Sequence, residues 1–154
     1  LYPHINFIGI EARKEVIYKA AQKVKQKGVQ NVRLLLFDIN NISDIFASEE
    51  VDRIFINFCD PWPKNRHAKR RLTNRLFLEK YQLLLKPKGQ IFFKTDNEKL
   101  FEFSLNEFSN KDLKLAHITF DLHHSEMDNI CTEYEQKFSA LGMPIFRCEA
   151  TFRN

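Results

Sequence analysis

The residues with the clearest chemical potential lie in one short stretch, DPWPKNRHAKRRL, which runs from Asp60 to Leu72. An aspartate precedes a proline, and the chain's only tryptophan, Trp62, stands between two prolines. A residue before proline favours extended geometry, and the two prolines restrict the loop at low entropic cost. We therefore expect a loop of fixed shape that presents the Asp60 carboxylate to a flat polar ligand such as a nucleobase. The alternative is a rigid turn with Trp62 packed on the core.

Positive charge follows this aspartate at once. Residues 61–78 contain six lysines and arginines and no acid, whereas the other 136 residues together carry a charge of −2. A localised basic patch is typical of a protein with a phosphate-rich partner, although a solvated surface run has the same composition. We interpret the two features together: Asp60 addresses a base, and the cations from Lys64 to Arg71 hold the phosphate backbone.

Three further acids follow predicted strands. Glu11 comes after NFIGI, Asp38 after VRLLLF, and Asp96 just after QIFFK. Ligands bind beyond the carboxyl ends of parallel strands, so these acids and Asp60 predict a site on one rim. Glu11 could accept the hydroxyls of a ribose and Asp38 an exocyclic amine such as that of adenine, which suggests an adenosine-containing ligand. The structural alternatives are a favourable helix N-terminal charge for Glu11 and a turn residue for Asp38.

Short apolar runs alternate with segments of helical period along the chain. We expect strands at 6–10, 32–37, 51–58, 90–94, 113–120 and 145–152. Helices are expected at about 16–28, 73–85, 100–108 and 132–141, and the polar stretch 43–48 could also be helical. Gly28 should end the first helix and residues 86–89 should close the second. This order predicts a single α/β domain over residues 1–154, with a mainly parallel sheet whose last two strands could form an antiparallel edge.

Composition excludes several other classes of protein. Hydrophobic residues make up 44% and charged residues 29%, and no apolar run approaches the roughly 20 residues that span a bilayer. No secretory signal is recognisable. Cys59, Cys131 and Cys148 show no C-x-x-C spacing, which argues against a disulfide scaffold or zinc site and for the reducing cytoplasm. His123 and His124 are adjacent with no third ligand evident, so we expect an exposed loop and no metal.

The segment Thr132-Glu133-Tyr134-Glu135 has the T-x-x-E pattern of a capping box at a helix N-terminus. That structural role does not exclude contact with a ligand. No serine or cysteine nucleophile motif and no phosphate-binding G-x-x-x-x-G-K-[ST] motif is present in the sequence.

Four segments carry a resemblance to a known family: NFIGIE at 6–11, NFCDPWPKNRHAKRRL at 57–72, FKTDN at 93–97 and TEYEQKF at 132–138. They resemble the bacterial tRNA (guanine-N7-)-methyltransferases, over essentially the whole chain. The resemblance implies a Rossmann-like class I methyltransferase fold, S-adenosylmethionine as methyl donor and tRNA as partner. It also implies guanine 46 of the tRNA variable loop as the acceptor, and it is compatible with a homodimer.

Carried over residue by residue, the resemblance implies that Glu11, Asp38 and Asp60 contact the cofactor and that Asp60 is also catalytic. The implied substrate-binding residues are Lys64, Asp96, Thr132, Glu133, Tyr134 and Glu135. The residues implied to meet the RNA are Arg66, His67, Ala68, Lys69, Arg70 and Arg71.

The glycines depart from the family pattern. The family has a first strand and a glycine-rich turn before the segment that matches NFIGIE, whereas the four glycines of this chain show no G-x-G spacing. We therefore expect a sheet that lacks its first strand and helix and exposes apolar surface. Two alternatives follow, a non-catalytic tRNA-binding module and an inactive fragment of such an enzyme. A nicotinamide-dependent oxidoreductase would share Glu11 and the strand–helix pattern but would leave the basic run unexplained.

Overall fold

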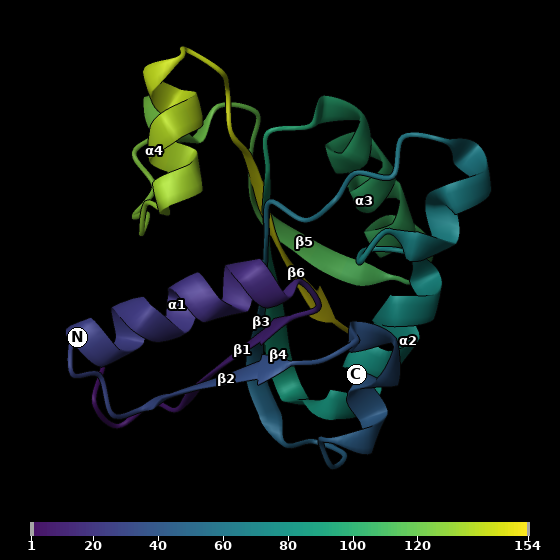
Figure 1. Ribbon diagram of the computed structural model, residues 1–154. Helices are drawn as coiled ribbons and strands as arrows, with labels where there is room; N and C mark the ends of the chain where they lie inside the picture. The colour runs from purple at the N-terminus through teal and green to yellow at the C-terminus, as the bar shows by residue number, and fades with distance from the viewer. Residues whose placement is uncertain (1, 154) are drawn as a thin grey trace. The chain divides into compact units, whose positions relative to one another are not determined.

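The computed structural model describes residues 2–153 (Figure 1). The chain divides into two compact units, Leu1–Ile45 and Phe46–Asn154. Each unit is an α/β arrangement. The expectation of a single domain over 1–154 stays a prediction.

The first unit is built on two parallel strands. Strand β1 (Phe7–Glu11) pairs with β2 (Val32–Leu36), and helix α1 (Lys14–Gln26) connects them. The helix ends where expected, because Gly28 takes a φ of 61°, the left-handed geometry that favours glycine after a helix. A 3-10 helix, η1 (Ile39–Asp44), follows β2 and begins earlier than the polar stretch 43–48 that we expected to be helical.

The second unit contains a four-stranded sheet in the order β3-β4-β6-β5. Strands β3 (Val51–Asn57) and β4 (Leu85–Thr95) are parallel. Strand β6 (Phe146–Phe152) runs antiparallel to both β4 and β5 (Leu113–Thr119). The expected antiparallel pairing of the last two strands is therefore confirmed, with β5 at the sheet edge.

Two helices provide the core of this unit against the sheet. Helix α2 (Arg75–Leu84) begins at an Asn74 N-cap, and α3 (Glu98–Asn110) follows β4 (Figure 1). The ring of Phe93 on β4 lies 6.1 Å from that of Phe101 and 6.3 Å from that of Phe108, and all three side chains are buried. Each such side chain stabilises the fold by about 1.5–3 kcal/mol through burial. The core therefore holds β4 and its carboxyl end firmly in place.

Some elements differ from their predicted form. Residues 86–89, expected to close a helix, lie within β4, where the pairing with β3 shifts between Val51 and Arg53. Short 3-10 helices form at η2 (Asn65–Arg70) and η3 (Leu122–His124), and α4 spans Glu133–Ala140. Large apolar side chains on β1, β2 and β3 are exposed, among them Ile8, Leu36 and Phe55. Within residues 2–153, none of the helices combines the length and apolar character needed to cross a membrane.

Candidate functional site

In the first unit, the two predicted cofactor acids lie at the same edge of the β1–β2 pair. Glu11 is the last residue of β1, and its backbone carbonyl accepts a hydrogen bond from Phe37 N–H, one residue before Asp38. Each carboxylate also has a local structural role at the start of the helix that follows it. Glu11 Oε1 accepts from Arg13 N–H at 2.9 Å before α1, and Asp38 Oδ1 accepts from Asn40 N–H at 2.9 Å as the N-cap of η1.

In the second unit, Asp60 and Asp96 follow the carboxyl ends of neighbouring parallel strands. Phe58 N–H, just past β3, donates to the Lys94 carbonyl of β4 at 2.9 Å, and Asp96 comes directly after β4. The Asp60 side chain is exposed and that of Asp96 is half-buried. The structure thus brings these two acids to one edge of the sheet, the place where ligands bind in folds of this kind.

The backbone around Asp60 is unusual at two positions. Phe58 has a φ of 53° and Trp62 a φ of 43°, and both are bulky residues in the left-handed region. Such conformations cost about 1–3 kcal/mol each and persist only where their surroundings hold them. Burial and the negative charge of Asp60 also raise the pKa of the Cys59 thiol to about 12, so Cys59 is a poor nucleophile at neutral pH. The loop is therefore held in one conformation by its surroundings, with Asp60 exposed at its surface.

Cationic side chains lie along η2, directly after this loop. Lys64 is its N-cap residue, and the side chains of Lys64, Arg66, Lys69 and Arg70 are exposed. The Arg70 guanidinium lies 4.9 Å from the Trp62 ring centroid, and the half-buried His67 meets the same ring edge-on at 5.8 Å. Ala68 is half-buried and its carbonyl accepts a hydrogen bond from Arg71 N–H. The segment therefore presents charge and an aromatic–cation stack together.

Arg71 differs from its basic neighbours because it is buried. Its guanidinium donates to the Pro61 carbonyl at 3.2 Å and to the Trp62 carbonyl at 3.0 Å, and it lies 4.4 Å from the Phe103 ring centroid. This side chain packs against the loop and the Phe103 ring. Its contacts fix the carbonyls of the loop that follows Asp60.

The segment Thr132 to Glu135 forms the predicted capping box. Thr132 Oγ1 accepts from Glu135 N–H at 3.1 Å, and the Glu135 carboxylate accepts from Thr132 N–H, at the first turn of α4. Tyr134 stacks on Phe138 at 4.3 Å and lies 4.8 Å from the Phe58 ring. Partial burial and the negative charge of Asp96 raise the pKa of the Tyr134 hydroxyl. Tyr134 is thus placed beside the loop of Asp60 and close to Asp96.

Glu135 itself is fully buried. Its Oε2 accepts a hydrogen bond from the Lys94 ammonium at 2.8 Å, and Asn129 donates to Oε1. Burial alone would raise the pKa of this carboxyl, but the hydrogen bonds from Lys94 and Asn129 and the Lys94 charge together lower it below its ordinary value. Glu135 is therefore a buried anion whose charge is compensated within the protein.

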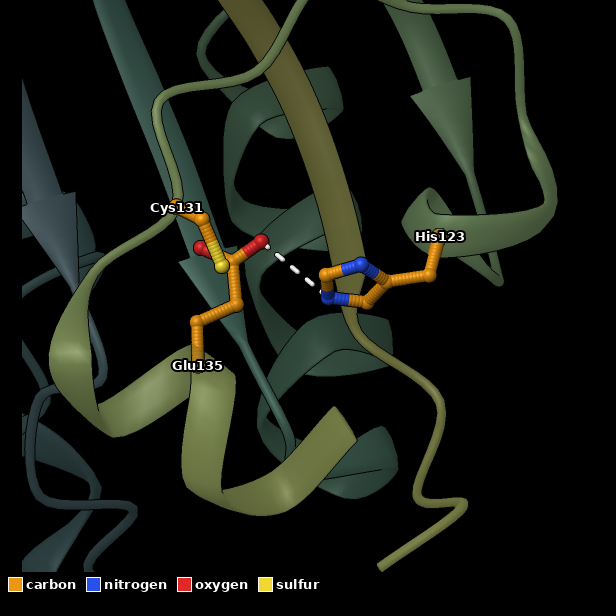
Figure 2. A group of neighbouring side chains, drawn as sticks. All are labelled: His123, Cys131 and Glu135. Atoms are coloured by element: carbon orange, nitrogen blue, oxygen red, sulfur yellow. Dashed lines mark ion pairs between the residues drawn. The ribbon is translucent and has the colours of Figure 1, made fainter. Parts of the chain in front are cut away.

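His123 has neighbours that its sequence position does not reveal. The expectation that no third ligand accompanies the histidines is wrong, because ligand atoms of His123, Cys131 and Glu135 all lie within 4.8 Å of one another. Figure 2 shows His123 and Cys131 pointing toward the Glu135 carboxylate, with His123 Nε2 3.2 Å from Oε1. His124 is not part of this cluster, and its Nδ1 forms a hydrogen bond with Asp121 Oδ2 at 2.7 Å.

Two structural residues escaped the sequence analysis. The signal for Lys94 is its place in the apolar strand QIFFK, because a lysine in such a strand needs a buried partner. Asn129 offered no signal, because it lies in a loop and acts only through its contacts with Lys94 and Glu135.

Comparisons with known proteins identify the family of the chain. Residues 1–148 match the family described as "Putative methyltransferase". The tRNA (guanine-N(7)-)-methyltransferase of Bacillus licheniformis is 55% identical over 152 residues, which are 98% of this chain and 71% of that protein. The enzyme of the same name from Clostridioides difficile is 53% identical over 99% of this chain and 72% of its own length.

The solved structures support the fold. A SAM-dependent methyltransferase from Aquifex aeolicus superimposes with a TM-score of 0.63 at 15% identity, over 96% of this chain and 69% of that one. This likeness confirms the Rossmann-like methyltransferase fold. With relatives above 50% identity over nearly all of its length, the chain belongs to the tRNA (guanine-N(7)-)-methyltransferase family.

Proposed function

We propose that this protein transfers a methyl group from S-adenosylmethionine to N7 of a guanine in tRNA, and that the acceptor is guanine 46 of the variable loop. The observation that carries the proposal is the exposed Asp60 carboxylate in a rigid loop at the end of β3, followed at once by exposed cations. The relatives named tRNA (guanine-N(7)-)-methyltransferase support the reaction type.

The residues of the first unit fit the cofactor. Glu11 and Asp38 place two carboxylates at one edge of a parallel strand pair, and carboxylates accept hydrogen bonds from the hydroxyls and the amine of an adenosine. When bound, S-adenosylmethionine supplies the methyl group from its sulfonium. In our proposal Glu11 takes the ribose, Asp38 takes the adenine amine, and Asp60 provides a further contact.

The reaction requires little acid–base chemistry from the protein. Guanine N7 has a free lone pair, so no proton has to leave before it forms a bond to the methyl carbon. Catalysis then depends on alignment and electrostatics. The purine becomes positive as the bond forms, and the fixed Asp60 carboxylate stabilises that charge. Lys64, Asp96 and the segment Thr132 to Glu135 would line the guanine pocket, where Asp96 and Tyr134 already lie close together.

The exposed cations Arg66, Lys69 and Arg70 would bind tRNA phosphates, with His67 and Ala68 completing the surface of η2. Phosphate contacts position the substrate and contacts to the base provide specificity. Arg71 would support this surface as a buried residue, because its guanidinium donates hydrogen bonds to the Pro61 and Trp62 carbonyls. The cytoplasm, where tRNA is modified, is the compartment we propose, and a homodimer stays a prediction.

The test is methyl transfer from labelled S-adenosylmethionine to unmodified tRNA, with the product mapped by strand scission specific for N7-methylguanine. We expect one cleavage in the variable loop. Titration calorimetry with S-adenosylmethionine distinguishes the alternative of a tRNA-binding module. That alternative predicts tRNA binding with no heat from the cofactor and no transfer, a result that would overturn the proposal.

A further inference from the structure

The buried ion pair between Lys94 and Glu135 uses nearly all the hydrogen-bonding capacity of both side chains. The Lys94 ammonium has three N–H donors, and three acceptors surround it. These acceptors are Glu135 Oε2 at 2.8 Å, Asn129 Oδ1 at 2.9 Å and the Ile130 carbonyl at 3.1 Å. The Glu135 carboxylate meets Lys94, Asn129 and its own capping-box N–H, with His123 Nε2 beside Oε1. The carboxylate is therefore enclosed almost entirely by partners within the protein.

This ion pair closes a ring of contacts around the end of the sheet. The Lys94 carbonyl accepts a hydrogen bond from Phe58 N–H, and the Phe58 ring lies against that of Tyr134. The next residue, Glu135, accepts a hydrogen bond from the Lys94 ammonium. Lys94 also lies two residues before Asp96 on the same chain segment. The first turn of α4 is therefore tied to the strand that carries Asp96 and to the loop that carries Asp60.

We propose that Lys94 and Glu135 are positioning residues of the methyl-transfer site: their buried ion pair holds the first turn of α4, with Thr132 and Tyr134, in place to form the guanine pocket. This inference rests on the proposed function. It gives Glu135 a role through the residues whose positions it fixes, and it gives Lys94 a role in the same site.

Energetics favours a positioning role over a contribution to stability. Desolvation of two buried charges offsets most of their attraction, so apolar replacement of both partners is often neutral for stability, whereas loss of one partner leaves an uncompensated buried charge. What the charged pair adds is a defined geometry, with the loop carbonyl of Ile130 and the amide of Asn129 bonded to the same ammonium.

The test compares Lys94→Met, Glu135→Gln and the double variant Lys94→Met/Glu135→Leu, each in the full chain. The matched control is Lys86→Met, because Lys86 lies on β4 like Lys94 but its ion pair is exposed to solvent. Its partner is Asp52 at 2.9 Å. We measure kcat and KM for unmodified tRNA, S-adenosylmethionine affinity by calorimetry, and the urea midpoint. Hydrogen exchange of residues 125–140 reports the order of α4 independently of activity.

We expect each single variant to lower kcat/KM for tRNA about 100-fold, the effect of a misplacement of about 1 Å, with cofactor affinity within twofold of wild type. The double variant should regain the wild-type urea midpoint yet keep the low kcat/KM. A double variant that regains stability and activity together would show a merely structural pair and overturn the inference.

Failure of the proposed function gives a different pattern. If wild type and Lys86→Met transfer no methyl group, the reaction assignment fails, and hydrogen exchange decides the structural part. Faster exchange of residues 125–140 in Lys94→Met, with β4 and α3 unchanged, would support the ion pair as the element that holds α4. Unchanged exchange in that segment would contradict it.

Discussion

The Arg71 guanidinium donates to the Trp62 carbonyl through both Nε and Nη2, at 3.2 and 3.0 Å. This contact links the last cation of the basic run to the loop that begins with Asp60. Trp62 is one of the two bulky residues near Asp60 with positive φ, so the buried arginine holds a strained segment that would otherwise relax. Arg71 thus has a structural role in the loop that follows Asp60.

We predict that Arg71→Met destabilises the protein by about 1.5–3 kcal/mol, the range for hydrogen bonds to charged groups. Arg71→Lys should recover only part of this loss, because an ammonium cannot replace the planar guanidinium that reaches both carbonyls and the Phe103 ring. Urea unfolding measures both. The control is Arg66→Ala, which removes an exposed cation of the same segment and should change stability by less than about 0.5 kcal/mol. Equal effects of Arg71→Met and Arg66→Ala would contradict the buried role.

The exposed cations of η2 predict the salt dependence of tRNA binding. Each phosphate neutralised contributes to the slope of log affinity against log salt, so Arg66→Ala, Lys69→Ala and Arg70→Ala should each reduce that slope by about 1. Filter binding or fluorescence anisotropy over a salt series measures the slope. Lys86→Met, which removes an exposed lysine outside this segment, should leave it unchanged. A slope that all three η2 variants leave intact would exclude this surface as the phosphate contact.

The Lys94–Glu135 pair predicts a stability that depends on pH in the acid range. The pKa of Glu135 is lowered in the folded protein, so its contribution to the free energy of unfolding is present above the ordinary value of 4.5. That contribution is lost as the pH falls through the lowered, folded-state pKa. Glu135→Gln should therefore be less stable than wild type at pH 7, and the difference should shrink as the pH falls below 4.5. Urea unfolding at a series of pH values measures it, and a constant difference down to pH 3 would contradict the ion pair.

The cluster of His123, Cys131 and Glu135 has the ligand types of a metal site, yet we predict no functional metal there. The Lys94 ammonium already neutralises the carboxylate at 2.8 Å and would repel a cation. A chelator should leave methyl transfer unchanged, and one equivalent of Zn²⁺ should not raise the melting temperature relative to Mg²⁺. A rise of several degrees that disappears in Cys131→Ser would show that the cluster binds zinc.

The sequence predicted most of the elements and the acids at strand ends because these depend on local pattern. Period-two and helical apolar spacing mark β3, α2 and α3, and Asp60 and Asp96 are visible as acids after apolar strands. The capping box at Thr132 was equally readable, since its two partners are three residues apart.

What the sequence could not show depends on contacts between distant residues. Lys94 and Glu135 are 41 residues apart, and only the fold shows that the glutamate is buried against this lysine. Arg71 looks like its exposed neighbours in charge, and its burial follows from the turn that ends η2. Residues 86–89 predict a helix end because proline and glycine are common there. The same residue types also occur where a strand is irregular, and that is their place in β4.

The most direct test of the proposed chemistry is Asp60→Ala in the mapped methyl-transfer assay under single turnover. Asp60 is exposed, so we expect the free energy of unfolding of the variant to lie within about 0.5 kcal/mol of the wild-type value. The rate of N7 methylation should fall at least about 100-fold, because the carboxylate that stabilises the developing positive charge is gone. Asp52→Ala, which removes an exposed acid near the start of the same strand, should keep the wild-type rate. Near-normal N7 methylation by Asp60→Ala would contradict the assignment of this residue and of the site built around it.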